Sequence, residues 1–271
     1  MLPKPEMDAS LPLKNKWIAN TRAEHQAQPL TKKLLAAGAN VIHFPLLSIE
    51  PPKNLKEVEQ QLALLGNYDL AVFISSNAVE QTLNKIDARV LKTLKLACVG
   101  EKTGLVLKAH DLKIDFCPKQ FFNSEALLAL DAFQKFIPGK KIALIKGHGG
   151  RKLLEKSLRK WGGDINTIEV YRRTCPNHNI DFLKKYHQHQ ELDIIILTSG
   201  FSVCNFFTLA GNLSDSSKAG ANNKEDWIDS LTLLLGSERL QKYVPDNFKG
   251  RVIFAEDPSD ETLLKELSVN N

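Results

Sequence analysis

The sequence predicts an α/β protein built from two similar domains with parallel sheets. Short apolar runs alternate with longer stretches in which apolar residues recur every three or four positions, which is the pattern of βαβ units. The pattern also repeats. "DLAVFISSNAVEQT" begins at Asp69 and "DIIILTSGFSVCNF" begins at Asp193, 124 residues later. The length of 271 residues suits two domains of ordinary size.

The same offset relates two stretches that each predict a strand, a helix, a glycine and a second strand. Residues 16–45, "KWIANTRAEHQAQPLTKKLLAAGANVIHFP", align with residues 140–169, "KKIALIKGHGGRKLLEKSLRKWGGDINTIE". Arg22 then matches Lys146. Gly38 and Gly162 follow the two helical patterns, where a left-handed glycine commonly ends a helix.

Two further pairs continue the repeat in the same order. "LKLACVGEKTGLVLK" predicts a strand ending near Gly100, and "LTLLLGSERLQKYV" predicts one ending near Gly236; a polar insertion at 211–226 lengthens the second offset. "KIDFCPKQFFNSEALLAL" and "RVIFAEDPSDETLLKEL" each predict a short strand, a loop with proline, and a helix. We expect Ser124 with Glu125, and Ser259 with Asp260, to open those helices. Strand–turn–helix units also recur by chance, but four pairs in one order favour an internal duplication.

Composition narrows the class of protein. The net charge is +5, and the cations are interleaved with Asp and Glu, which argues against a nucleic-acid binder. No apolar run approaches the roughly 20 residues that span a membrane, and the N-terminus lacks the apolar core of a signal peptide, so we expect a cytoplasmic protein. The four cysteines have no C-x-x-C spacing, so we expect free thiols and no metal site.

The candidate site lies where the predicted parallel strands end, because loops at their carboxyl ends form the binding crevice of such sheets. Ser, Thr, Asn and Gly in these loops cap helices and leave backbone N–H groups accessible to anions. Two domains with such loops would surround a ligand with several anionic groups. The alternative is that these residues only cap helices. The loops are Thr21–Arg22, 75–77, 100–103, 146–151, 198–200 and 236–239.

Familiar nucleotide and hydrolase motifs are missing from the sequence. "KGHGGR" is neither a Walker A motif nor G-x-G-x-x-G, which leaves ATP or NAD binding without support. There is no G-x-S-x-G elbow. Tyr171, at the end of the apolar strand "TIEVYRRT", has a hydroxyl that can donate a proton. A tyrosine in this place also suits plain packing against a neighbouring strand residue.

The order and spacing of these motifs resemble the uroporphyrinogen-III synthase family from about residue 16 to 267. The resemblance rests on "TRAEHQAQPLTKKLLAAGANVIHFPLLSIEPP", "DLAVFISSNAV", "ACVGEKTG", "NSEALL", "KGHGGRKLLEKSLRKWGGDINTIEVYRR", "DIIILTSGFSV" and "SDETLL". It implies two flavodoxin-like domains joined by a two-stranded connector. These would be residues 1–46 with 174–271, residues 51–168, and connector strands 47–50 and 169–173. Lys146 departs from the arginine that bacterial members usually carry before the glycine-rich loop.

The resemblance also implies the reaction. The family's substrate is hydroxymethylbilane, a linear tetrapyrrole that bears carboxylates and readily loses its hydroxyl. The enzyme inverts the last pyrrole ring before it closes the macrocycle, and it mainly supplies orientation. The resemblance implies no cofactor or metal, a monomer, and a possible handover from hydroxymethylbilane synthase.

The site residues follow residue by residue from the same resemblance. Tyr171 matches the family's tyrosine that is proposed to assist departure of the hydroxyl. Other positions would bind substrate carboxylates. They are Arg22, Ser75, Ser76, Asn77, Lys102, Thr103, Ser124, Lys146, Gly147, Arg151, Ser199, Gly200 and Ser237.

Two alternatives from other classes stay open at this point. A non-catalytic two-domain protein that binds a small anion would have a similar fold, but such proteins are usually exported. A nucleotide-sugar transferase also places its site between two α/β domains, but it needs a nucleotide loop that the sequence lacks.

Overall fold

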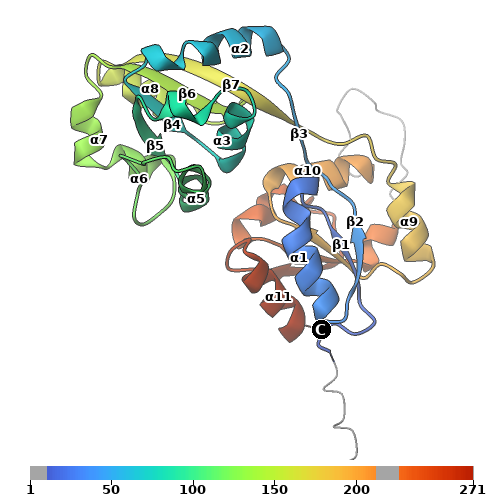
Figure 1. Ribbon diagram of the computed structural model, residues 1–271. Helices are drawn as coiled ribbons and strands as arrows, with labels where there is room; N and C mark the ends of the chain where they lie inside the picture. The colour runs from blue at the N-terminus through green and yellow to red at the C-terminus, as the bar shows by residue number, and fades with distance from the viewer. Residues whose placement is uncertain (1–10, 212–225, 271) are drawn as a thin grey trace, which may run out of the picture. The chain divides into compact units, whose positions relative to one another are not determined.

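The computed structural model describes residues 11–211 and 226–270, and the chain divides into two compact units. Unit 1 comprises residues 1–48 and 175–271, and unit 2 comprises residues 49–174. Figure 1 shows each unit as a sheet flanked by helices. The predicted insertion at 211–226 lies almost entirely outside the described residues.

The sheet of unit 1 has the strand order β10-β9-β8-β1-β2, and every neighbouring pair is parallel. The first part of the chain supplies β1 and β2 with α1 between them, and the last part supplies the rest. The elements are β1 (Trp17–Asn20), α1 (Glu24–Ala36), β2 (Asn40–His43), α9 (Asp181–Gln188), β8 (Ile194–Leu197), α10 (Gly200–Leu209), the 3₁₀ helix η2 (Asp226–Ser230), β9 (Thr232–Leu235), the 3₁₀ helix η3 (Glu238–Tyr243), β10 (Arg251–Phe254) and α11 (Asp260–Val269).

Both faces of this sheet are covered, because its strands are apolar on both sides. One face packs against α1 and α11, which lie side by side (Figure 1), through leucines such as Leu34 and Leu263. The other face packs against α9, α10 and the 3₁₀ helices through Leu183, Phe206 and Leu240. The alternating residues of β8 divide between these two clusters, as the period of a strand requires.

The sheet of unit 2 has the order β3-β7-β6-β4-β5, in which β7, β6, β4 and β5 are parallel neighbours. Its elements are β3 (Ser48–Glu50), α2 (Leu55–Ala63), the 3₁₀ helix η1 (Leu65–Asn67), β4 (Leu70–Phe73), α3 (Ser76–Leu83), α4 (Ala88–Leu91), β5 (Lys95–Cys98), α5 (Glu101–Ala109), α6 (Ser124–Leu128), α7 (Asp131–Phe136), β6 (Lys141–Gly147), α8 (Leu153–Lys160) and β7 (Asp164–Thr174).

Helices again cover both faces. Residues of α2, α3, α4 and α5 pack on one side, and residues of α6, α7 and α8 pack on the other. The chain crosses between the units within β3 and just after β7, and these two strands are neighbours in this sheet. The predicted connector strand 47–50 spans the first crossing, and the predicted strand 169–173 lies within β7, just before the second. A connector as a separate element stays a prediction.

The duplication predicted from the sequence appears as one topology built twice. Strands β6, β7, β4 and β5 occupy the places that β1, β2, β8 and β9 occupy in unit 1. Gly38 and Gly162 have φ values of +93° and +83°, as predicted for left-handed caps. Asp69 and Asp193 repeat a smaller detail, since each carboxylate accepts the backbone N–H of the neighbouring strand's first residues, Lys141 at 2.9 Å and Trp17 at 2.7 Å.

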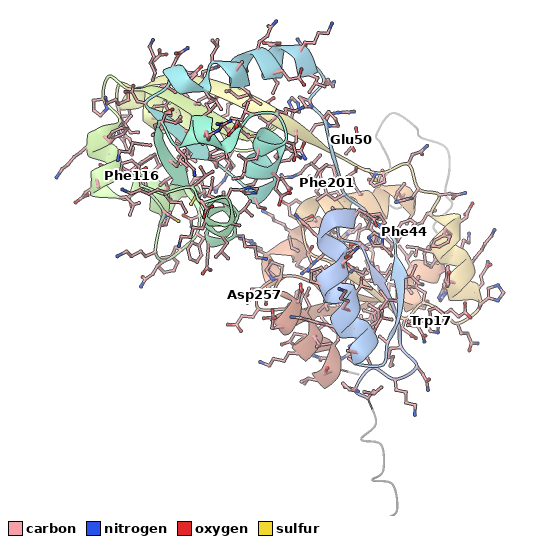
Figure 2. All side chains as sticks on the ribbon, in the orientation of Figure 1. Trp17, Phe44, Glu50, Phe116, Phe201 and Asp257 are labelled. Carbon is pink, nitrogen blue, oxygen red and sulfur yellow. The ribbon has the colours of Figure 1, made fainter. Side chains whose placement is uncertain are left out.

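Two predicted elements differ. The strand expected at 113–117 is wrong, because this segment makes only a single bridge between Phe116 and Ala97, whereas its counterpart β10 is a full strand. Phe116, which is labelled in Figure 2, packs against the core of unit 2, with its ring centroid 5.4 Å from that of Phe133. The helix after β9 is η3, a 3₁₀ helix where unit 2 has α5. Across the described residues, no helix is long and apolar enough to span a membrane.

Candidate functional site

Ser75 marks the carboxyl edge of the unit 2 sheet, directly after β4. It is the N-cap of α3, and its Oγ accepts the backbone N–H of Ala78 at 3.2 Å. Extended backbone at Ser75 turns the chain abruptly from strand to helix. Ser76 begins the helix and is half-buried, whereas Asn77 is buried and offers a ligand little surface.

Tyr171 lies nearby, on β7, and is only 1% exposed. The pairing of β6 with β7 shifts by one residue between Lys146 and Gly147, so that Lys146 pairs with Glu169 and Gly147 with Tyr171. Consecutive strand residues normally point to opposite faces, yet Val170 and Tyr171 both enter the cluster beneath α3. The irregularity therefore turns the Tyr171 ring toward Ser75.

The Tyr171 hydroxyl has two polar partners among the described residues. Ser75 Oγ lies 3.0 Å away, and the Arg173 guanidinium donates to the phenolic oxygen at 3.2 Å. Arg173 also lies over the ring, 5.8 Å from its centroid. Arg173 itself is exposed, so it covers Tyr171 from the solvent side.

The glycine-rich loop after β6 packs against this tyrosine. A Cβ placed on Gly147 would lie 2.5 Å from the Tyr171 ring, so no larger residue fits without moving the ring. The His148 N–H donates to the Tyr171 carbonyl at 2.7 Å, and Glu169 accepts the Gly149 N–H at 3.1 Å while it contacts His148 Nδ1 at 2.6 Å. These bonds fix the loop to β7.

A pocket of about 490 Å³ opens beside this loop, within unit 2. It includes Lys146, which makes no ion pair among the described residues, but neither Ser75 nor Tyr171. Lys146 therefore lines a pocket in the same unit as the tyrosine, but the tyrosine does not line that pocket. The lining residues are Pro52, Lys53, Asn54, Glu57, Val58, Gln61, Lys146, His148, Gly149, Gly150, Lys152, Glu155, Thr167, Glu169 and Arg172.

The other predicted residues of unit 2 have varied surroundings. Ser124 is not the cap of α6; Asn123 is, and its Oδ1 accepts the Ala126 N–H at 2.8 Å. The prediction was one residue out because Asn and Ser cap equally well. Arg151 pairs with Glu125 at 2.5 Å, and this guanidinium holds the pKa of the Glu125 carboxyl below its usual range.

Lys102 and Thr103 lie in the first turn of α5, shortly after the carboxyl end of β5. Lys102 is exposed and Thr103 is buried. Only the lysine therefore presents its functional group to the surroundings.

The carboxyl edge of unit 1 has a similar backbone but different side-chain contacts. Ser199 caps α10 in a reciprocal capping box with Ser202, and its hydroxyl donates to Ser202 Oγ at 3.1 Å. Gly200 lies against the ring of Tyr243, since an added Cβ would come within 2.5 Å of it. Ser237 precedes η3 and makes no cap bond. No buried tyrosine stands beside Ser199 among the described residues.

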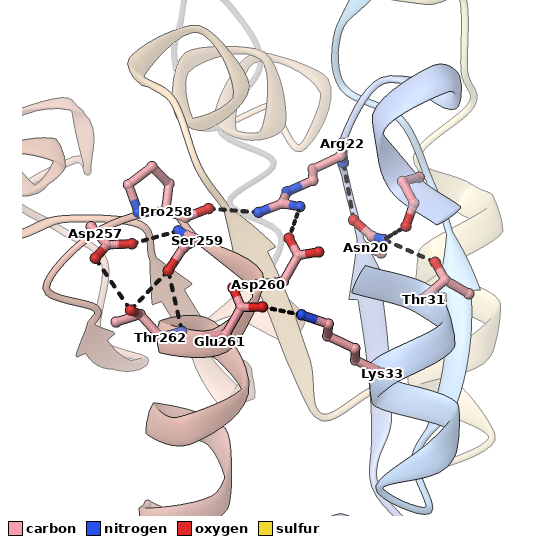
Figure 3. Close-up of polar contacts among 11 residues, drawn as sticks. Asn20, Arg22, Thr31, Lys33, Asp257, Pro258, Ser259, Asp260, Glu261 and Thr262 are labelled. Carbon is pink, nitrogen blue, oxygen red and sulfur yellow. Dashed lines mark hydrogen bonds and ion pairs between the residues drawn. The ribbon is translucent and has the colours of Figure 1, made fainter. Parts of the chain in front are cut away.

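Arg22 is already engaged inside unit 1 (Figure 3). Its guanidinium forms an ion pair with Asp260 and donates to the Pro258 carbonyl oxygen at 2.6 Å. Pro258 lies in the loop before α11, and Asp260 is the first residue of that helix. Ser259 caps α11 as predicted, because its Oγ accepts the Thr262 N–H at 3.3 Å. Arg22 thus joins the end of β1 to the start of α11.

Arg173 is the site residue that sequence reasoning missed. A signal was available, because residues two apart in a strand share a face and Tyr171 was already a candidate. The adjacent Arg172 has a different contact, however, because it pairs with Glu50 on β3, and only the structure separates the two arginines.

Comparisons with known proteins agree with this architecture. Residues 28–265 match the family model described as uroporphyrinogen-III synthase HemD. A uroporphyrinogen-III synthase from Synechococcus elongatus is 31% identical over 211 residues, which cover 76% of this chain and 79% of that protein. One from Escherichia coli is 26% identical, with coverage of 92% and 99%.

A solved structure gives the same fold. The crystal structure of a mutant uroporphyrinogen III synthase from Thermus thermophilus matches with a TM-score of 0.58 and 16% identity, covering 93% of this chain and 96% of that one. Together these findings define a two-domain α/β enzyme of porphyrin and haem biosynthesis. More narrowly, the chain belongs to the uroporphyrinogen-III synthase family. The two alternative classes are not favoured.

Proposed function

We propose that the chain cyclises hydroxymethylbilane to uroporphyrinogen III, with loss of water and inversion of the last pyrrole ring. The family match over residues 28–265 carries this proposal. The site supports it, because the carboxyl edges offer hydroxyls, amides and helix N-termini but none of the nucleotide or hydrolase motifs sought in the sequence.

Substrate binding is assigned to the loops at the carboxyl edges of each unit. Hydrogen bonds from neutral donors to carboxylates are worth roughly 1.5–3 kcal/mol each, so several of them can hold a polycarboxylate in one shape. The proposed contacts are Ser75, Ser76, Asn77, Lys102, Thr103, Ser124, Lys146, Gly147, Arg151, Ser199, Gly200 and Ser237. Arg22 would join them only by exchanging Asp260 for a substrate carboxylate.

Tyr171 is assigned to assisting departure of the substrate hydroxyl. Orientation supplies most of the remaining rate, since the bilane reacts without help once its hydroxyl has left. The expectations of no cofactor, a monomer, a cytoplasmic location and handover from hydroxymethylbilane synthase stay predictions.

An isomer assay tests the function. Hydroxymethylbilane is generated in place by its synthase, the protein is added, and the oxidised products are separated by chromatography. We expect a product shifted from the type I to the type III isomer. Type I alone at the spontaneous rate, from protein shown to be folded, would contradict the proposal.

A further inference from the structure

Tyr171 is buried, so its hydroxyl is poorly placed to touch the substrate, and another group has to donate the proton to the leaving hydroxyl. The side chain is 1% exposed, enclosed by the Gly147 backbone, Ser75 and Arg173. A buried phenol has to place its hydrogen on an acceptor. The direction of its hydrogen bonds therefore decides where its proton can go.

The contacts fix that direction. Arg173 has only donors, so it can donate to the phenolic oxygen but cannot take its hydrogen. Ser75 Oγ, at 3.0 Å, is then the acceptor that the Tyr171 hydroxyl has among the described residues. Because Ser75 Oγ also accepts the Ala78 N–H, both of its lone pairs are occupied, while its own hydrogen is uncommitted.

We propose that the hydroxyl of Ser75, and not that of Tyr171, donates to the departing hydroxyl of the substrate, and that Tyr171 and Arg173 act behind it as a directed relay. The inference rests on the proposed function. The chain of donation runs from Arg173 Nη2 to Tyr171 Oη to Ser75 Oγ, and its free end is the half-buried serine at the helix start.

The relay balances in protons. The bond from the terminal methylene carbon to its oxygen breaks, and that oxygen takes the Ser75 proton and leaves as water. Ser75 takes the Tyr171 proton, and the phenolate formed is stabilised by the Arg173 guanidinium at 3.2 Å. The bilane returns one proton when the ring closes, since the overall reaction releases only water, and that proton restores Tyr171.

The matched serine of unit 1 shows that a cap alone does not make such a donor. Ser199 also follows a strand and caps a helix, but its hydrogen goes to Ser202 Oγ. In unit 2 the position equivalent to Ser202 is Ala78, which has no hydroxyl to receive it. The uncommitted hydrogen is therefore specific to Ser75.

The test separates the hydroxyl of Ser75 from its capping role. Asn caps helices as well as Ser but has no hydroxyl, whereas Thr keeps both functions. In the isomer assay we expect Ser75→Thr to keep kcat within a few-fold, and Ser75→Asn and Ser75→Ala each to lower kcat roughly 100-fold, the usual scale for an acid catalyst. KM should change much less, because in this proposal the Ser75 hydroxyl acts on the departing hydroxyl and not on a substrate carboxylate. Ser259→Ala, which removes a cap elsewhere, should leave activity unchanged.

Two further variants test the direction of the relay. The double variant Ser75→Asn with Tyr171→Phe should be no slower than the slower single variant, because the two groups pass one proton along one path. Arg173→Met should lower kcat, and Arg173→Lys should recover part of that loss because it keeps the charge and a donor.

The outcomes distinguish the relay from the function. Type III product from the wild type, with Ser75→Asn active within threefold, would overturn the relay alone. So would multiplicative losses in the double variant. Type I product alone from the wild type would overturn the proposed function, and the relay with it.

Discussion

The carboxyl edges of the two sheets can be compared position by position, because residues 124 apart occupy equivalent places. Ser75 and Ser199 both cap a helix after a buried strand. Arg22 lies just after β1, and Lys146 lies near the end of the equivalent strand β6. In unit 1 both side chains have a polar partner at a helix start, Ser199 with Ser202 and Arg22 with Asp260. In unit 2 the serine bonds to a buried tyrosine and the lysine is unpaired among the described residues.

This difference shows that duplication preserved the backbone positions while the side-chain hydrogen bonds diverged. Unit 1 uses its polar groups to hold elements together. In unit 2 the equivalent serine instead contacts Tyr171, and the equivalent lysine lines a pocket. Each pair is therefore a matched test and control within one chain.

The largest expected effect is the difference in kcat between Phe variants of the two tyrosines that lie against edge glycines, Tyr171 and Tyr243. Tyr171→Phe removes the buried hydroxyl and should lower kcat roughly 100-fold or more, since acid catalysis contributes on this scale. Tyr243→Phe should stay within about twofold, because Tyr243 is 38% exposed and only its ring packs on Gly200. Steady-state kinetics with separation of the isomers measures both, and equal losses would remove the distinction between the units.

Variants of the two equivalent cations, Arg22 and Lys146, should differ in whether they lower stability or weaken substrate binding. Arg22→Met leaves Asp260 without its partner and should lower the free energy of unfolding by about 1–3 kcal/mol, less than a fully buried pair because some solvent reaches it. Lys146→Met should change stability by less than about 0.5 kcal/mol but raise KM for the bilane. Denaturant unfolding and KM values check this, and a raised KM for Arg22→Met alone would reverse the assignment.

The edge glycines should differ in tolerance to a methyl group. Gly147→Ala places a Cβ 2.5 Å from the enclosed Tyr171 ring and should cost roughly 1–3 kcal/mol of stability. Gly200→Ala meets Tyr243 equally closely, but that ring is partly exposed and can swing aside, so the cost should be smaller. Thermal unfolding of the two variants compares them directly, and similar losses would show that exposure of the ring does not matter.

The smallest effect should be that of Asp69. The Lys141 backbone N–H, together with Lys140, lowers the pKa of this carboxyl below its usual value near 3.8. A lowered pKa means that the charged form stabilises the fold above about pH 4, and that this contribution is lost as the pH falls through the lowered pKa. Asp69→Asn should cost less than about 1 kcal/mol at pH 7, because the pair is exposed. Denaturant unfolding at several pH values should show that the stability lost by Asp69→Asn shrinks as the pH falls. A loss that does not depend on pH would contradict this prediction.

Much of the fold was accessible from the sequence because the repeat fixes strands, helices and glycine caps together. Gly38 and Gly162 follow from the need for a left-handed residue after a helix, and Ser75 and Ser199 follow from capping. The absence of a strand at 113–117 could not be predicted from the sequence. An apolar residue such as Phe116 fits a strand, but it fits equally well a loop whose side chain packs into the core.

The site was less accessible. Sequence spacing identifies Tyr171 as a candidate, but it shows neither the one-residue shift against β6 nor the burial of the hydroxyl. A strand with regular alternation would have directed the ring to the other face. The hydrogen bond from Arg173 to the Tyr171 hydroxyl also depends on that shift, because the shift determines where the hydroxyl lies. Long-range geometry of this kind is set by packing, not by local propensity.

The strand order also has a consequence for the time course of folding. Unit 1 needs β1 to pair with β8, and the Trp17 N–H to reach Asp193, 176 residues away. Unit 2 is continuous from residue 49 to 174. During synthesis unit 2 can close its sheet while β1 and β2 still wait for β8, β9 and β10. Since chain closure over long separations slows folding and leaves strand edges unpaired meanwhile, the N-terminal strands should be the last to settle and the most open to aggregation on the ribosome.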